Sequence, residues 1–162
     1  MRKKMKIRSD FVTNSSSSSF IVFYKDAPSM LSDLQSFVKN YQDDEYSHQF
    51  RDVVTDILRN KITYEQAINK YQEYLKYLSW RDCQNNEEKI KEFGGCQNWI
   101  NSNEFALMRE EYEKKELEKF KEKISDTGIF AYLTYSDSDG YYDVTKSLQD
   151  MLNTLCINMG EY

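Results

Sequence analysis

The scarcity of glycine and proline constrains the fold of this chain more than any other feature of its sequence. Only five glycines and one proline occur in 162 residues. A β-sandwich needs many tight turns, which these residues supply, whereas long helices exclude both from their interiors. The chain has about the length of one domain and is apolar enough to bury a core without disulfides or metals. We therefore expect an α+β fold that is mostly helical.

Apolar residues recur at helical spacing through most of the chain. The clearest start signal is Thr63, because Gln66 three residues later completes a capping box. Gly94 is placed to end a short helix in a left-handed cap. The pattern predicts one helix that begins at Tyr64, and further helices over 29–41, 50–58, 85–93, 102–125 and 145–160.

Two segments have strand character. Phe20–Tyr24, "FIVFY", is continuously apolar, which is typical of a strand buried on both faces. Ile129–Ser136 is a second strand, followed by the turn signal "DSDG" and by "YYDV" as its hairpin partner. We expect a small sheet formed by the N-terminal strand and this C-terminal hairpin. Residues 1–10 are predicted to be a basic flexible tail and residues 11–162 a single domain.

Five serines, Ser15–Ser19, precede the first predicted strand. Their hydroxyls can bond to nearby amides and fix a bend at the rim of the sheet. A phosphate-binding loop would need glycines and a Lys-Ser/Thr pair, and a nucleophile elbow would need GxSxG, neither of which is present. The sequence therefore favours a structural or partner-contacting run over a catalytic one.

The segment "FVTNSSSSSF", residues 11–20, resembles an opening signature shared by small uncharacterised proteins of Firmicutes and of their phages and mobile elements. In some of them we expect a later acidic turn similar to "YSDSDG", Tyr135–Gly140. The resemblance covers at most sixteen residues and carries no activity. It implies a bacterial or phage accessory protein, and such proteins often bind and block a host enzyme, as anti-CRISPR proteins do.

Charge is distributed unevenly along the chain. The net charge is −5, but residues 1–10 carry five cations and one acidic side chain, so the remainder is at −9. Such an acidic body repels phosphates, and we expect no contact with nucleic acid except through the basic tail. The alternating signs of the helix over 102–125 are typical of a solvated face rather than of a nucleic-acid mimic.

The cysteines, the histidine and the tryptophans do not indicate a catalytic or metal-binding site. The odd number of cysteines and the absence of a CxxC pair favour reduced thiols in the cytoplasm, with Cys83 and Cys156 buried. His48 is the only histidine, and its position is typical of a surface loop. Trp80 and Trp99 are expected to pack in the core, with an interface anchor as the alternative.

The sequence predicts no membrane-spanning segment, no metal site and no cofactor; the "DSDG" turn lacks two ligand positions of a calcium loop. We expect a non-catalytic protein-binding module with a host or phage protein as its partner. The alternative is a nucleotide-, phosphate- or metal-binding enzyme that uses Ser15–Ser19 and the Asp137/Asp139 turn. The oligomeric state is left open. The residues predicted to contact a partner are Asn14, Ser15, Ser16, Ser17, Ser18, Ser19, Asp43, Asp44, Glu45, Asp137, Asp139 and Asp143.

Overall fold

The computed structural model describes residues 17–45, 47–136 and 142–160, and for residues 142–145 only the backbone. By their contacts, the residues divide into two compact units. The first, here the sheet unit, contains residues up to Lys61 and from Ala131 onward; the second, the hairpin unit, contains Ile62–Phe130. The predicted tail lies outside the described residues. The expectation of one domain over 11–162 stays a prediction, because two compact units can belong to one domain or to two.

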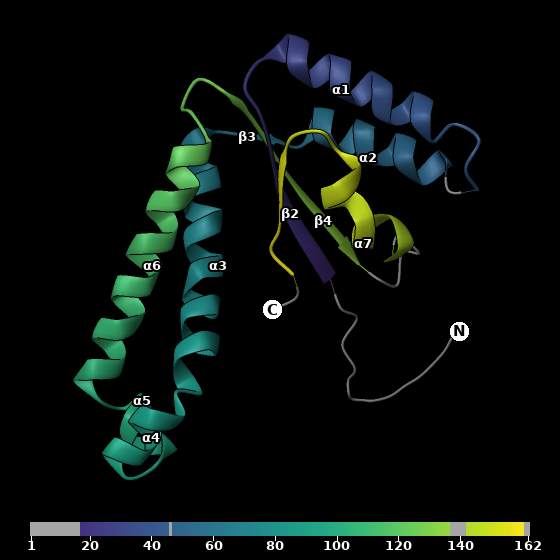
Figure 1. Cartoon of the computed structure of the whole chain (residues 1–162). Helices are drawn as coiled ribbons and strands as arrows, with labels where there is room; N and C mark the ends of the chain where they lie inside the picture. Colours follow the sequence, from purple (N-terminus) through teal and green to yellow (C-terminus); the bar gives the residue numbers. More distant parts are fainter. Residues whose placement is uncertain (1–16, 46, 137–141, 161–162) are drawn as a thin grey trace. The chain divides into compact units, whose positions relative to one another are not determined.

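The chain is mostly helical with one small sheet, as the sequence predicted (Figure 1). In order, its elements are β2 (Ser17–Tyr24), α1 (Ala27–Asn40), α2 (Ser47–Arg59), β3 (Lys61–Ile62), α3 (Tyr64–Gln84), α4 (Glu87–Phe93), α5 (Cys96–Ile100), α6 (Asn103–Lys123), β4 (Ile129–Ser136), α7 (Tyr142–Met151) and β5 (Leu155–Asn158). None of the helices in the described ranges combines the length and the apolar character that crossing a bilayer requires.

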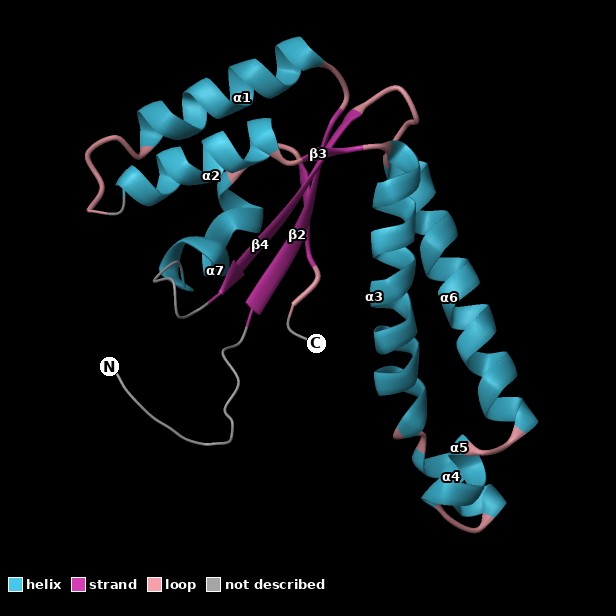
Figure 2. Cartoon of the chain, turned by 180° about the vertical axis from the view of Figure 1, so that it is seen from behind, coloured by secondary structure: helices cyan, strands magenta, loops and turns pink. Residues whose placement is uncertain are grey.

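The sheet has the strand order β3-β4-β2-β5. Strand β2 therefore lies between β4 and β5, and it runs antiparallel to both (Figures 1 and 2). Phe20 pairs with Asn158 and Phe23 with Leu155. Residues Phe20–Tyr24 are all buried, and Phe20 and Val22 are completely so. The predicted strand buried on both faces is confirmed, as is the pairing of the first strand with β4.

The serine run does not form a bend over the residues that are described. Ser17–Ser19 belong to β2, so the strand begins three residues earlier than predicted. Ser19 is buried, and its carbonyl accepts a hydrogen bond from the Met159 amide just after β5. The prediction was that serine hydroxyls would form hydrogen bonds to the backbone here. Instead, the Ser19 backbone carbonyl forms its hydrogen bond with the backbone beside a neighbouring strand.

The C-terminal region differs from the prediction in two ways. Strand β4 covers the predicted residues, but residues 142–144 of the segment expected as its hairpin partner begin helix α7 instead. The predicted closing helix is wrong beyond Met151, because Leu155–Asn158 forms strand β5. Asn153 and Thr154 mark the change: the Asn153 amide donates to Asp33, and the Thr154 hydroxyl donates to the Phe23 carbonyl. These bonds hold the turn that brings β5 alongside β2.

Helices α1 and α2 form an antiparallel pair within the sheet unit (Figures 1 and 2). The Asp26 side chain caps α1 by accepting from the Ser29 amide at 2.7 Å. Phe37 on α1 meets Phe50 on α2 edge to face, with ring centroids 5.5 Å apart, and Tyr41 packs on both rings. Aromatic contacts of this geometry fix how the two helices pack together.

The hairpin unit consists of two long antiparallel helices, α3 and α6, joined by the short helices α4 and α5 (Figure 1). The predicted capping box is present: the Thr63 hydroxyl accepts from the Gln66 amide, and the Gln66 side chain accepts from the Thr63 amide. Gly94 ends α4 with a φ of 79°, in the left-handed region that the prediction required. The predicted capping box at the start of α3 and the predicted left-handed cap at the end of α4 are therefore both confirmed.

Apolar contacts occur along α3 and α6, and Leu75 in the middle of α3 is almost completely buried. Toward one end of the pair, the Tyr71 ring in the first half of α3 stacks on Phe120 with centroids 4.2 Å apart. At the other end, Cys83, Trp99 and Phe105 form a small buried cluster. The Trp99 indole N–H donates to the Cys83 carbonyl at 2.9 Å, so the large buried ring leaves no polar atom unsatisfied. The expected core position of Trp99 is confirmed.

Candidate protein-binding surfaces

The structure describes only some of the residues predicted to contact a partner. Asp43, Asp44 and Glu45 are exposed in the loop between α1 and α2. Asp143 lies in α7, but its side chain is not among those described. Five further candidates lie outside the described residues: Asn14, Ser15, Ser16, Asp137 and Asp139. The hypothesis that the serine run meets the Asp137/Asp139 turn therefore stays a prediction.

Of the serines that the structure describes, Ser17 and Ser18 are half-buried and Ser19 is buried, and the Ser19 hydroxyl is engaged within the sheet. It lies 3.4 Å from the Thr134 hydroxyl and 3.3 Å from the Tyr132 hydroxyl, both on β4. These contacts link β2 to β4 through side chains as well as through the strand ladder. In this position Ser19 supports the sheet, and it is not presented to a ligand in solution.

Two of the three thiols, those of Cys83 and Cys156, lie in packed, buried positions. Cys83 and Cys156 are buried and Cys96 is exposed; all three are free. Burial raises the pKa of the Cys156 thiol to about 12 and also raises the pKa of Cys83. A thiol with a raised pKa holds its proton at neutral pH and is a poor nucleophile. Among the side chains of residues 17–45, 47–136 and 146–160, no three His, Cys, Asp or Glu gather to hold a metal ion.

A surface that the sequence did not single out lies on the hairpin unit. We call it the aromatic–arginine patch and define it as Tyr77, Trp80, Arg81 and Arg109. Trp80 and Tyr77 are 39% and 38% exposed, which is high for rings of this size. The Trp80 ring meets Phe105 edge to face at 5.3 Å. The predicted core position of Trp80 is thus wrong, and the anchor that the sequence offered as the alternative fits its exposure.

Each arginine of the patch lies over an aromatic ring. The Arg109 guanidinium carbon is 5.4 Å from the centre of the Trp80 ring, and that of Arg81 is 5.9 Å from the Tyr77 ring. Cation–π contacts of this kind hold an arginine and a ring together at a surface. Arg81 also pairs with Asp82 at 2.9 Å. Hydrogen bonds from Arg81 and Tyr112 lower the pKa of Asp82, so this carboxylate stays charged.

Ser79 positions Arg109 from beneath the patch. Its hydroxyl is completely buried, donates to the Glu113 carboxylate at 2.6 Å and accepts from Arg109 Nε at 3.0 Å. Arg109 also donates to the Lys76 carbonyl at 2.9 Å. One buried hydroxyl therefore joins α3 to two charged residues of α6. Because these bonds fix the guanidinium, the patch is ordered before any partner arrives.

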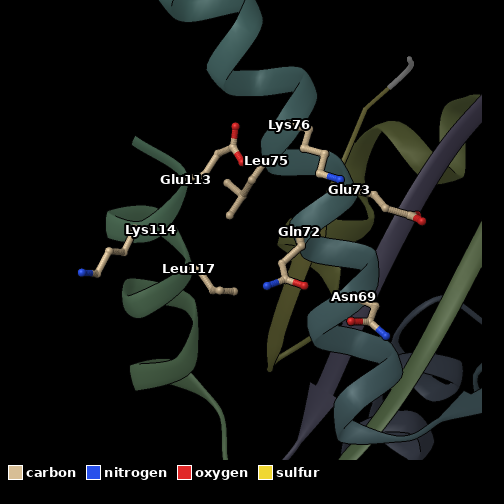
Figure 3. A pocket seen from close by; sticks show the side chains of 8 residues that line it. All are labelled: Asn69, Gln72, Glu73, Leu75, Lys76, Glu113, Lys114 and Leu117. Carbon is tan, nitrogen blue, oxygen red and sulfur yellow. The ribbon is translucent and has the colours of Figure 1, made fainter. Parts of the chain in front are cut away.

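A hollow lies between α3 and α6, with a volume of about 630 Å³ (Figure 3). Its lining includes Leu75 and Leu117 from the two helices, surrounded by polar side chains. Two of these are acidic, Glu73 and Glu113, and two are basic: Lys76 and Lys114. With balanced charges and no buried polar group directed into it, this hollow does not select an anion or a cation.

The sheet unit has an apolar groove between α1 and α2, with a volume of about 390 Å³. Leu31 and Leu58 are 49% and 40% exposed at its edges. The full lining is Leu31, Leu34, Gln35, Val38, Lys39, Gln42, Val54 and Leu58. The sequence treated these apolar residues as part of the buried stripes. One signal in the sequence could have indicated this groove: apolar residues occupy adjacent positions, such as 30/31, 37/38 and 57/58. Two adjacent residues of a helix point in different directions, so one apolar residue of each pair must lie outside the buried face.

Comparison of the chain with models of known families, with curated proteins and with solved structures finds no match.

Proposed function

We propose that this chain is a non-catalytic protein-binding accessory protein of a bacterium, phage or mobile element, and that it inhibits a host defence complex in the manner of an anti-CRISPR protein. The N-terminal resemblance supports the bacterial or phage context. The acidic body supports a protein partner over a nucleic acid. The free cysteines fit a reducing compartment, and we place the protein in the cytoplasm.

The observation that carries the proposal is the aromatic–arginine patch. Tryptophan, tyrosine and arginine are the residues that most often dominate the energy of protein interfaces. Here all three types share one surface, and Ser79 and Glu113 hold Arg109 in place. A preordered patch loses little conformational entropy on binding, which favours affinity.

The test is capture of host proteins from a bacterial lysate by the tagged full chain. We expect Trp80→Ala to reduce the captured partner at least tenfold, since a central aromatic anchor contributes about 2 kcal/mol or more. Leu107→Ala is the matched control: this side chain is 63% exposed and lies two residues from both Phe105 and Arg109, on the other side of α6. Equal loss in both variants, or no specific partner, contradicts the proposal.

Inhibition is tested separately by phage plaque counts on a strain that carries the defence complex captured in the lysate. We expect the wild-type chain to restore plaques and Trp80→Ala to fail, with equal cellular levels of both proteins. A ligand panel provides the opposing test. An increase in melting temperature with inorganic phosphate, ATP or Mg²⁺ would favour the enzyme alternative instead.

A further inference from the structure

The hollow between α3 and α6 adjoins another hollow on the same pair of helices. The hollow in Figure 3 has a volume of about 630 Å³, and its neighbour has a volume of about 430 Å³. The neighbouring hollow is lined by Tyr64, Glu65, Ile68, Asn69 and Lys121, and Asn69 lines both hollows. The two hollows therefore follow one another along the α3–α6 pair.

At its other end, the hollow in Figure 3 reaches the aromatic–arginine patch. Lys76 and Glu113 line this hollow, and both contact Arg109: the Lys76 carbonyl accepts from the guanidinium at 2.9 Å, and the Glu113 carboxylate lies 3.8 Å from it. Positions 65, 69, 72, 76 and 80 lie three or four residues apart, so they form one stripe along α3. We call the surface that runs from Tyr64 through both hollows to Trp80 the hairpin groove.

Ile68, Leu117 and Trp80 provide apolar surface along the hairpin groove. Ile68 and Leu117 are half-buried, and Trp80 is 39% exposed. Trp80 follows Ile68 by twelve residues, which is about 18 Å along a helix. Leu117 lies near the midpoint of this distance, because positions 120 and 113 of α6 contact positions 71 and 79 of α3.

The spacing of these apolar side chains fits a helix better than an extended strand. Each step along the groove is roughly 9 Å, and residues seven positions apart on one face of a helix are separated by about 10.5 Å. On one face of a strand, residues are separated by about 6.6 or 13 Å. A helix also satisfies its own backbone hydrogen bonds, so the groove has to match only its side chains.

Charges of both signs line the hairpin groove. Its acidic residues are Glu65, Glu73 and Glu113, and its basic residues are Lys76, Lys114 and Lys121. Each of the two helices contributes both signs. A polyanion such as a nucleic acid would meet carboxylates along the whole groove, whereas the flanks of an amphipathic helix can carry charges of both signs.

We infer that the hairpin groove holds an amphipathic helix of the partner protein. The apolar stripe of this helix lies on Ile68, Leu117 and Trp80, and its charged flanks lie on the charged residues of α3 and α6. Amphipathic helices bind grooves in this way, through apolar anchors that recur along one face. The inference rests on the proposed function, because Trp80 belongs to the aromatic–arginine patch and also forms one end of the groove.

The first test blocks the middle of the groove with Gln72→Trp. Gln72 is exposed, and its side chain points into the space between α3 and α6 (Figure 3). We expect capture of the partner from the bacterial lysate to fall at least tenfold, although the patch itself is unchanged. Lys115→Trp adds the same ring at an exposed site two residues from both Glu113 and Leu117, on the other side of α6, and should not reduce capture. Circular dichroism of both variants confirms that they fold.

The outcome separates this inference from the proposed function. If Trp80→Ala loses the partner and Gln72→Trp retains it, the inference is overturned and the proposed function stands. If both variants retain the partner, or if the lysate yields no specific partner, both are overturned.

The second test identifies the segment that lies in the groove. The full chain with Gln72→p-benzoylphenylalanine is irradiated in the same lysate, and the cross-linked segment of the partner is sequenced by mass spectrometry. We expect a segment of about 15 residues with apolar residues at seven-residue spacing. Lys115→p-benzoylphenylalanine is the control and should not cross-link this segment. Equal cross-linking from both positions, or a segment without this spacing, overturns the inference.

The third test examines whether the segment binds as a helix. A synthetic peptide with the cross-linked sequence should gain helical circular dichroism when it binds the full chain. Proline at the centre of the peptide should weaken binding at least tenfold, because proline breaks a helix. Binding without a gain of helix, or equal binding of the proline variant, overturns the inference.

Discussion

The sheet unit and the hairpin unit bury their apolar residues by different means. In the sheet unit, an uninterrupted apolar run, Phe20–Tyr24, lies between two strands that come from the far end of the sequence. In the hairpin unit, aromatic clusters lie toward the two ends of α3 and α6, and the polar bonds of Ser79 join the helices between them. The sheet unit thus depends on distant pairing, whereas the hairpin unit depends on local helix signals and on the extensive packing of α3 against α6.

The largest expected effect comes from removing the aromatic core at the tip of the hairpin unit. Trp99 is completely buried, so Trp99→Ala should lower the free energy of unfolding by about 3–5 kcal/mol. Trp80→Ala removes an exposed ring that has one edge contact with Phe105 and one cation–π contact with Arg109, and should cost about 1–2 kcal/mol. Urea unfolding followed by far-ultraviolet circular dichroism measures both. Similar losses of unfolding free energy in the two variants would show that burial does not determine how much each tryptophan stabilises the fold.

A smaller effect compares one buried serine from each unit. Ser79 bonds to two charged residues, and Ser79→Ala should cost about 1.5–3 kcal/mol. Ser19 has only neutral partners at 3.3 and 3.4 Å, and Ser19→Ala should cost about 0.5–1.5 kcal/mol. The same denaturation experiment ranks the two. A larger loss of unfolding free energy for Ser19→Ala would mean that the two long hydrogen bonds of Ser19 stabilise the sheet unit more than their lengths indicate.

Local signals made the hairpin unit predictable. The capping box at Thr63 and the left-handed Gly94 each depend on residues no more than four positions away. The sequence could therefore place most of this unit before any tertiary contact was known. In the sheet unit, a local signal of this kind identifies only β4, by its β-branched and aromatic residues.

Contacts between residues far apart in the sequence determine the structural features that could not be predicted. Leu155–Asn158 is apolar enough for a helix or a strand, and pairing with β2, more than 130 residues earlier, decides between them. Serines seldom favour strands, yet Ser17–Ser19 extend β2 because β5 and β4 lie beside it. The exposure of Trp80 was equally inaccessible, since it depends on how α6 packs on α3.

The smallest expected effect concerns how the two units begin their helices. Hydrogen bonds from the Ser29 side chain and amide lower the pKa of Asp26, the cap of α1, whereas the cap of α3 is the uncharged Thr63. Because the pKa is lowered in the folded state, the unfolded chain takes up this proton first as the pH falls. The cap's stabilisation is therefore complete above the ordinary aspartate pKa of about 4 and is lost below it.

Two variants separate these caps. The loss caused by Asp26→Ala should shrink between pH 6 and pH 3, whereas Thr63→Ala should cost about 1 kcal/mol at both values. Urea midpoints at the two pH values give the comparison. A pH-independent loss for Asp26→Ala would mean that its carboxylate does not cap α1 in solution.

The position of β2 also has a consequence for synthesis on the ribosome. This strand leaves the exit tunnel early, but its neighbours β4 and β5 begin only at Ile129 and Leu155. At 5–20 residues per second, the wait for the first of them is roughly 5 to 20 seconds. During this interval the nascent chain carries an unpaired "FIVFY" segment of the kind that self-associates. Translation rate and ribosome-bound chaperones should therefore affect the yield of this protein more than that of a chain whose neighbouring strands are made in succession.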